Sequence, residues 1–295
     1  MSSTTKHGPE LTLYRGWLEP GRYVWSPFVI KLEARLRFAG VRYDIKAGSA
    51  REAPRGKIPY VEIRQRGSDS ATSAGTVTTA AVDGDGPSCS TTLADSTLII
   101  KHLVERGILP DINAQASSPT VRAQDLAIRA LLEDKLYFYH SWERWTQNYY
   151  AMRDHVLCAL TFPVRLVVGL LIYRGTTQTL HGQGTGRYTP DEIRIFRSEI
   201  WEAINGLLIS SRARATVNGV PQDQPFWVLE GATPTEADAT LFGFIVSVLV
   251  CTACPESQQL VKQFPAILDY AGRIHDRYFP DYSKWNHAAA RSGTL

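Results

Sequence analysis

Two short segments of the chain carry residues suited to holding a small charged ligand. Lys57, Ile58 and Pro59 precede an apolar run, and Asp95 and Ser96 open a later helical pattern. Free N–H groups and the dipole at the start of a helix favour an anion such as a carboxylate. An X-Pro pair alone is an ordinary turn. Asp95 and Ser96 therefore predict a helix end that binds an anion. The X-Pro pair, taken together with this helix end, indicates one ligand-binding site.

Ser26 is the only hydroxyl at the start of the first predicted helix, which opens with Pro27 and ends at Gly40. Serine at this position is most often a helix cap. The same hydroxyl, together with the helix dipole, is also able to stabilise an anion. The residue type leaves both roles open.

Cys251 and Cys254 form a C-x-x-C pair, a spacing found in redox and metal sites. The pair follows an apolar helical run instead of a strand-to-helix turn, and the sequence offers no second cysteine pair or clustered histidines as further ligands. We therefore interpret the two residues as packing residues and expect reduced thiols and no metal site.

The elements that position these residues form a small mixed unit in the first half. Alternating apolar residues predict three strands, at 11–14, 41–45 and 60–63. Apolar residues at helical spacing predict two helices, at 26–40 and 96–106. Residues 66–90 are rich in Gly, Ser, Thr and Asp and have no apolar period, which predicts a flexible insertion. The order strand, helix, strand, strand, helix is typical of a sheet with a βαβ unit.

The second half has a helical pattern throughout. Apolar and aromatic residues recur at helical spacing over 121–154, 190–208 and 235–250. The longest apolar stretches, 159–173 and 239–253, fall short of about 20 apolar residues needed to span a bilayer. We predict that both are core helices and that the chain has no membrane span.

Length and composition limit the number of domains and the kinds of partner that we expect. The 295 residues are 44% hydrophobic and 21% charged, enough for two domains, which we place at 1–112 and 118–295. The net charge of +3 comes from 32 basic and 29 acidic residues spread along the chain, so no nucleic-acid partner is expected. The polar N-terminus lacks the pattern of a signal or transit peptide, which predicts a cytoplasmic protein.

With these segments in place, the sequence resembles the glutathione transferase family over nearly its whole length. The resemblance implies a thioredoxin-like α/β domain that binds glutathione, followed by an all-α substrate-binding domain. It implies that Ile58 and Pro59 dock the cysteinyl backbone of glutathione, that Asp95 and Ser96 hold its γ-glutamyl end, and that Lys57 faces its glycyl carboxylate.

The same resemblance suggests the catalytic residue. Ser26-Pro27-Phe28-Val29 occupies the place of the family's C-P-x-C or S-P-x-x turn. Ser26 is then expected to donate a hydrogen bond to the glutathione sulfur, and Val29 in place of a second cysteine disfavours dithiol chemistry. The segment before Ser26 is longer than usual in the family, so Tyr23 is the second choice, since a tyrosine hydroxyl serves this role in other members.

Three further segments resemble parts of the family. Residues 235–238 match the capping box that starts its buried core helix. Residues 180–187 resemble the H-G-x-G-x-G-R run of metaxin, failed-axon-connections-like proteins and microbial, including fungal, relatives, and we expect a tight interhelical connection there. About two thirds of the aromatic residues over 137–150 are expected in the core, and the rest in an apolar pocket.

The expected function is a glutathione-dependent transferase that activates the glutathione thiol for attack on a hydrophobic electrophile. One alternative is cis-trans isomerisation of an unsaturated compound of secondary metabolism. Another is a non-catalytic, metaxin-like scaffold, which the lack of a predicted membrane span disfavours. The resemblance also allows a homodimer.

Overall fold

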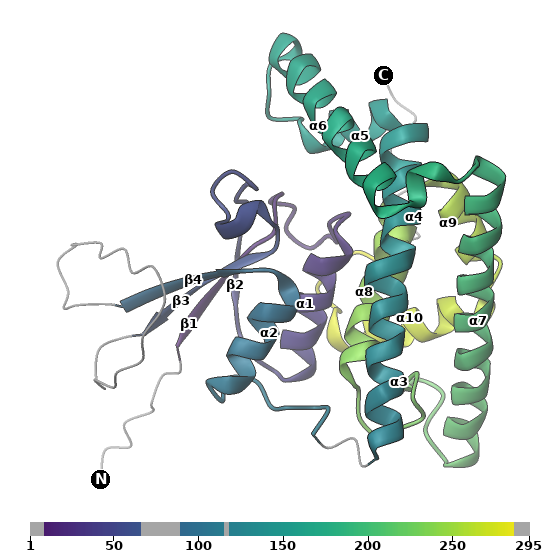
Figure 1. Cartoon of the computed structure of the whole chain (residues 1–295). Helices are drawn as coiled ribbons and strands as arrows, with labels where there is room; N and C mark the ends of the chain where they lie inside the picture. The colour runs from purple at the N-terminus through teal and green to yellow at the C-terminus, as the bar shows by residue number, and fades with distance from the viewer. Residues whose placement is uncertain (1–8, 66–88, 115–117, 286–295) are drawn as a thin grey trace.

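The computed structural model describes residues 9–65, 89–114 and 118–285, and begins with a four-stranded mixed sheet (Figure 1). The strands are β1 (Glu10–Tyr14), β2 (Asp44–Lys46), β3 (Tyr60–Gln65) and β4 (Cys89–Ala94). They lie in the order β2-β1-β3-β4, where β1 pairs with β2 in parallel and the other two pairs are antiparallel.

Two helices cover the face of this sheet that looks toward the second half: α1 (Pro27–Phe38) and α2 (Ser96–Glu105) (Figure 1). Leu13, Leu32, Val61 and Ile99 are among the residues of the small core between sheet and helices. Strand, helix and parallel strand β1-α1-β2 form the predicted βαβ unit, so the fold class of the first half is confirmed.

The structure corrects the predicted insertion at its end. Most of 66–90 lies outside the described residues, but Cys89 and Ser90 begin β4, a strand that the sequence pattern did not indicate. Only Leu93 and Ala94 give β4 an apolar end. The strand forms through its register with β3, from Gln65 opposite Cys89 to Tyr60 opposite Ala94, and not through an apolar period of its own.

The second half is helical, as predicted. One long run contains two π-helical segments, and longer helices follow: α3 (Pro119–Ala130), η2 (Leu131–Leu136), α4 (Tyr137–Trp142), η3 (Glu143–Gln147), α5 (Tyr149–Val156), α6 (Phe162–Gln183), α7 (Pro190–Val217), α8 (Glu236–Val250), α9 (Pro255–Lys262) and α10 (Pro265–Tyr278). Two short 3₁₀ turns, η1 (Pro54–Gly56) and η4 (Thr185–Arg187), complete the elements. The predicted connection at 180–187 consists of the last turn of α6, Gly184 and η4, and leads to α7.

The two apolar stretches predicted as core helices differ in how far the structure buries them. In α8, every residue from Ala237 to Leu249 is buried, so this prediction is confirmed. In α6 it is wrong, because most apolar side chains in the first half of the helix are exposed. No single helix among the described residues could cross a bilayer by length and composition; only α8 and α9 together pass that test, with a bend of 116° between them.

The main core unites both halves of the chain. Tyr23, Trp25, Ile30 and Ala34 from the first half belong to the same buried cluster as α8 and α10. Cys251 and Cys254 are fully buried in this cluster, where packing was predicted. Because the core is shared, the predicted boundary between 112 and 118 stays a prediction.

Candidate functional site

A cleft of about 430 Å³ lies where α1, α2 and the residues before β3 meet the long helical run. Its lining residues come from both halves of the chain: Phe28, Gly56, Lys57, Ile58, Asp95, Ser96, Glu133, Asp134, Tyr137 and Phe138. Four of the five residues predicted to bind glutathione are thus brought together. The fifth, Pro59, follows a cis peptide bond, and its carbonyl accepts a 3.3 Å hydrogen bond from the Asp95 N–H. We call this space the Asp95 cleft.

Asp95 is fixed at the mouth of α2 in an uncommon conformation. Its φ of 80° is rare for a residue other than glycine, and such positions are frequent at functional sites. Its Oδ1 accepts hydrogen bonds from the N–H groups of Thr97 and Leu98, at 3.2 and 3.4 Å, which caps the helix. Its Oδ2 lies 3.2 Å from Lys57 Nζ. One carboxylate oxygen is therefore committed to the helix, and the other faces the cleft's cation.

Lys57 keeps the freedom to change partner. Its side chain is 62% exposed, so the ion pair with Asp95 is the solvent-screened kind that contributes little to stability. An incoming carboxylate can therefore replace Asp95 as the partner of the Lys57 ammonium at small cost.

Two acidic residues in the cleft were missed by the sequence reasoning. Glu133 and Asp134 lie in η2, and π-helical turns occur preferentially at functional sites. Glu133 Oε1 accepts from Lys31 Nζ at 2.7 Å, whereas Asp134 is exposed at the rim. The available signal was an acidic pair one turn before Tyr137 on a predicted helix. The cleft thus places one ammonium, that of Lys57, beside three carboxylates, so it offers a partner to charged groups of either sign.

Ser26 stands at the start of α1 but does not cap it. Its backbone is extended and its carbonyl accepts from the Ile30 N–H at 3.3 Å, while the hydroxyl makes no capping hydrogen bond. The side chain is half-buried. Ser26 does not line the Asp95 cleft, although Phe28 from the same turn does. The structure thus brings the turn to the cleft and leaves the hydroxyl without its default role.

Tyr23 lies elsewhere, in the core. Its side chain is 4% exposed, and its hydroxyl is 2.7 Å from His275 Nδ1. Desolvation by burial, and then the nearby Glu33 carboxylate, raise the pKa of Tyr23 far above its ordinary value. Tyr23 is close to Ser26 in sequence, but its ring packs against Phe242 and Phe279 because the chain turns it inward. It is not brought to the cleft.

A second cleft of about 340 Å³ continues along the same helical run. Tyr137 and Phe138 line it as well as the Asp95 cleft, so the two spaces share these aromatic side chains. The remaining lining residues are uncharged and come from α4, η3 and α6: Ser141, Trp145, Ile172, Gly175, Thr176, Thr179 and Leu180. This space, which we call the aromatic cleft, suits a neutral, apolar molecule with a few hydrogen-bonding groups.

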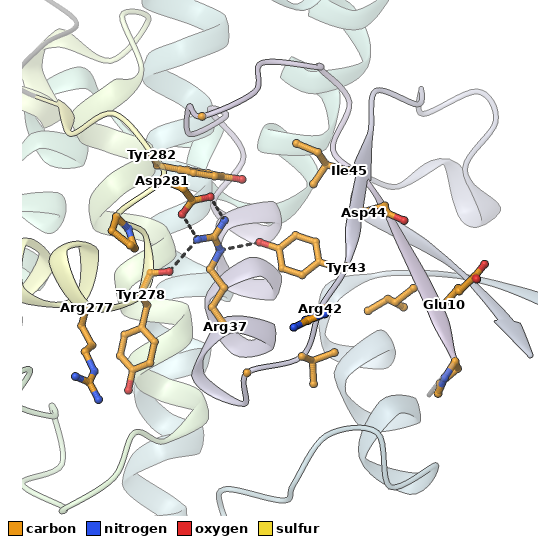
Figure 2. A pocket seen from close by; sticks show the side chains of 16 residues that line it. Glu10, Arg37, Arg42, Tyr43, Asp44, Ile45, Arg277, Tyr278, Asp281 and Tyr282 are labelled. Carbon is orange, nitrogen blue, oxygen red and sulfur yellow. Dashed lines mark hydrogen bonds and ion pairs between the residues drawn. The ribbon is translucent and has the colours of Figure 1, made fainter. Parts of the chain in front are cut away.

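A groove of about 870 Å³ is lined by β2, the end of α1, the end of α10 and the residues after it, and its centre is filled by a polar network (Figure 2). Arg37 donates to the Tyr43 hydroxyl and the Tyr278 carbonyl at 2.8 and 2.9 Å, and its Nη2 lies 2.8 Å from Asp281 Oδ2. The hydrogen bond from Arg37 lowers the pKa of Asp281. Because these groups satisfy one another, we interpret the groove as a structural junction.

The cysteine pair adds no further site to these spaces. Arg144 donates to the Trp25 carbonyl at 3.1 Å and lies 3.9 Å from Cys254 Sγ, all within the core. Among the residues that the structure describes, no group of three or more His, Cys, Asp and Glu side chains is placed to hold a metal ion.

Residues 27–152, which include every residue of the Asp95 cleft, match the family model of the glutathione S-transferase N-terminal domain. The chain resembles the glutathione S-transferase family, as its sequence predicts. The metaxin-like branch stays a prediction.

Solved structures of glutathione transferases are similar to the chain over most of its length. Glutathione transferase Omega 2S from Trametes versicolor is 15% identical, with 97% of both chains covered and a TM-score of 0.46. A rice glutathione transferase in complex with glutathione is 12% identical, with 95% of this chain and 93% of that chain covered and a TM-score of 0.47. Maleylacetoacetate isomerase from Anaeromyxobacter dehalogenans is 13% identical, with 97% of both chains covered and a TM-score of 0.40. These similarities are too distant to bear on activity.

Proposed function

We propose that the chain binds glutathione in the Asp95 cleft and activates its thiol for attack on a hydrophobic electrophile held in the aromatic cleft. The observation that supports this is the shared aromatic wall. Tyr137 and Phe138 border both a cleft with the charges of a peptide site and a neighbouring cleft without charged lining residues. A charged and an apolar reactant are thereby held side by side.

The charges of the cleft suggest how glutathione lies. Its γ-glutamyl ammonium would face the carboxylates of Asp95 and Asp134, and the adjacent carboxylate would face the start of α2 at Ser96. The backbone of Ile58 and Pro59 would dock the cysteinyl part. Lys57 would turn from Asp95 to the glycyl carboxylate.

The chemical step needs a thiolate next to the electrophile. Glutathione's thiol is mostly protonated near neutral pH, so a hydrogen-bond donor and the dipole of α1 would lower its pKa, and the released proton goes to solvent. The sulfur lone pair then forms a bond to the electrophilic carbon. If a leaving group departs with its electron pair, the product is a conjugate; if glutathione is expelled after rotation about a saturated bond, the product is an isomer.

We propose a cytoplasmic enzyme, with a glutathione-binding domain over 1–112 and a substrate-binding domain over 118–295. Conjugation and isomerisation both stay within the proposal, since either uses the same thiolate and accepts a neutral second reactant in the aromatic cleft. A scaffold protein of the metaxin kind would have no use for this pair of clefts.

The test is calorimetric titration with glutathione. We expect Asp95→Ala to weaken binding by about 1.5–3 kcal/mol, the range for a hydrogen bond to a charged group. Asp95→Asn keeps an acceptor for the α2 cap and tolerates a positive φ, so it isolates the loss of the carboxylate charge.

Ser118→Ala is the matched control, because it removes another helix cap, the one that accepts from the Val121 N–H at 3.2 Å, far from the charged residues of the cleft. It should leave the affinity for glutathione unchanged. No binding heat for the unaltered chain, or equal affinity for Asp95→Ala, would overturn the proposed function.

A further inference from the structure

Arg144 of η3 is a buried cation without a carboxylate to neutralise it. The residue is 6% exposed, and within the part of the chain that the structure describes no Asp or Glu side chain lies at ion-pair distance from its guanidinium. Its Nε is buried and makes no hydrogen bond. Buried charges are normally paired, because removing them from water is costly. The positive charge of Arg144 therefore acts on the groups around it.

The hydrogen bonds of Arg144 hold the residue that directly precedes Ser26. Its Nη1 donates to the Trp25 carbonyl at 3.1 Å. Its Nη2 donates at 2.9 Å to the hydroxyl of Ser247 on α8, which in turn donates to the same Trp25 carbonyl at 2.6 Å. The start of α1, where Ser26 is expected to meet the glutathione sulfur, is thus fixed from the core side by a cation.

The charge of Arg144 also acts on the side chain that the two clefts share. Burial raises the pKa of Tyr137, whereas the charges of Arg144 and Lys57 act to lower it. Lys57 lines the Asp95 cleft and is mostly exposed, while Arg144 lies in the core, where solvent and salt screen a charge much less. Two cations on different elements therefore favour an anion beside Tyr137.

The groups that titrate or carry charge around Arg144 leave its charge in place. They are Tyr137, His140, Glu143, Arg197, Cys251 and Cys254. The Glu143 carboxylate is taken by Arg197, 2.6 Å away. Burial and then the charge of Arg144 hold the pKa of His140 well below its ordinary value, so this ring stays neutral. Burial acts to raise the pKa of the Cys251 thiol, but its hydrogen bond with Cys254 and the charge of Arg144 bring it to about 7.

We propose that Arg144 is a positioning residue of the thiol-activating site, which fixes Ser26 through the Trp25 carbonyl and whose charge favours the thiolate of bound glutathione over the thiol. The inference rests on the proposed function. A nearby charge of opposite sign lowers the pKa of an acid by about 1–3 units. Arg144 stays protonated throughout, so the thiol proton still leaves to solvent.

The test measures the pKa of bound glutathione's thiol from the pH dependence of thiolate absorbance, after subtraction of the same protein without glutathione. We expect Arg144→Met to raise this pKa by about 1 unit or more, which lowers the ratio of thiolate to thiol about tenfold at a given pH. Arg144→Lys keeps the charge and should restore most of the difference. The affinity for S-methylglutathione, which has no ionisable thiol, should stay nearly unchanged in both, because its binding groups lie in the Asp95 cleft.

A second pair of variants cancels the charge without removing Arg144. Cys254 Sγ lies 3.9 Å from Arg144 Nη2, so Cys254→Asp places a carboxylate beside the guanidinium and should raise the thiol pKa as Arg144→Met does. Cys254→Asn is the matched control, with the same shape and no charge, and should leave the thiol pKa unchanged. This pair also decides the matter if circular dichroism shows that Arg144→Met does not fold.

The outcomes separate the inference from the proposed function. The inference is wrong if the thiol pKa is the same with and without the Arg144 charge, if Arg144→Lys does not reverse the rise, or if Cys254→Asn causes an equal rise, and normal binding of S-methylglutathione would then leave the proposed function standing. An unaltered chain that does not bind S-methylglutathione would overturn both.

Discussion

At the scale of single residues, we propose the hydroxyl of Ser26 as the group that acts on the glutathione thiol at the start of α1. It is released from its usual capping role, and the dipole of α1 adds to its effect. We predict that Ser26→Ala raises the pKa of bound glutathione's thiol, each unit corresponding to about 1.4 kcal/mol of lost thiolate stabilisation. The pH dependence of thiolate absorbance in the complex measures this pKa.

Tyr23→Phe is the control for this experiment. It removes a hydroxyl that is bonded to His275 in the core, so it should lower the stability of the fold and leave the thiol pKa unchanged. If Ser26→Ala leaves the thiol pKa where it was, the serine is only a residue at a helix start and another group activates the thiol.

The candidate site shows which residues a sequence discloses. Lys57 and Asp95 were found because each belongs to a local signal, a residue before an X-Pro pair and an acid at a helix start. Asp134 was not found from the sequence, because whether it lines the cleft depends on how the long helical run packs against α2. Tyr23 was misplaced because nearness to Ser26 along the chain does not fix the direction of its side chain.

At the scale of elements, the predictions failed where the structure of a segment depends on its neighbours in the fold and not on the segment's own apolar pattern. β4 has too few apolar residues to be seen alone and forms by pairing with β3. A core helix was predicted over 159–173, and a helix, α6, begins there at Phe162, but the predicted burial was wrong. An apolar run does not reveal whether other residues of the same chain cover it. Ile172 and Thr176 of the same helix line the aromatic cleft.

The predicted capping box at the start of α8 is confirmed, and its acid is a buried one. Asp238 accepts 2.8 Å hydrogen bonds from the N–H groups of Val228 and Thr235 and from the Tyr270 hydroxyl. Burial raises the pKa of Asp238 to about 6, despite these donors, which act to lower it. The folded chain therefore holds this proton more tightly than the unfolded chain, where the carboxyl has its ordinary pKa.

The sign of the pH dependence follows from this difference. The contribution of Asp238 to stability is fully present below the ordinary carboxyl pKa near 4 and is lost as the pH rises through about 6. We predict that the free energy of unfolding falls over this range by up to about 3 kcal/mol relative to Asp238→Asn, which does not titrate. Urea unfolding at a series of pH values measures it. Parallel pH profiles for the two proteins would show that Asp238 keeps an ordinary pKa.

At the scale of the whole molecule, the two halves meet along α1. Arg35 Nε lies 2.6 Å from Glu236 Oε1, and Lys31 Nζ lies 2.7 Å from Glu133 Oε1, so buried ion pairs join α1 to α8 and to η2. Removing one partner of such a pair leaves an uncompensated charge, which makes the junction intolerant of displacement. The Asp95 cleft takes its walls from both halves, and its shape therefore depends on how α1 is seated.

Gly243 of α8 is where this seating is closest. A Cβ there would lie 2.5 Å from the Pro27 carbonyl oxygen and 2.9 Å from the Lys31 N–H nitrogen, both backbone atoms of α1. We predict that Gly243→Ala pushes the start of α1 away, costs about 1–3 kcal/mol of stability and weakens glutathione binding. Gly206→Ala on α7 is the matched control: nothing lies within 4 Å of its added Cβ, so it should gain about 0.5–1 kcal/mol and bind normally. Urea unfolding and calorimetry measure both effects, and a Gly243→Ala protein with unchanged stability and affinity would show that the α1–α8 contact does not set the cleft.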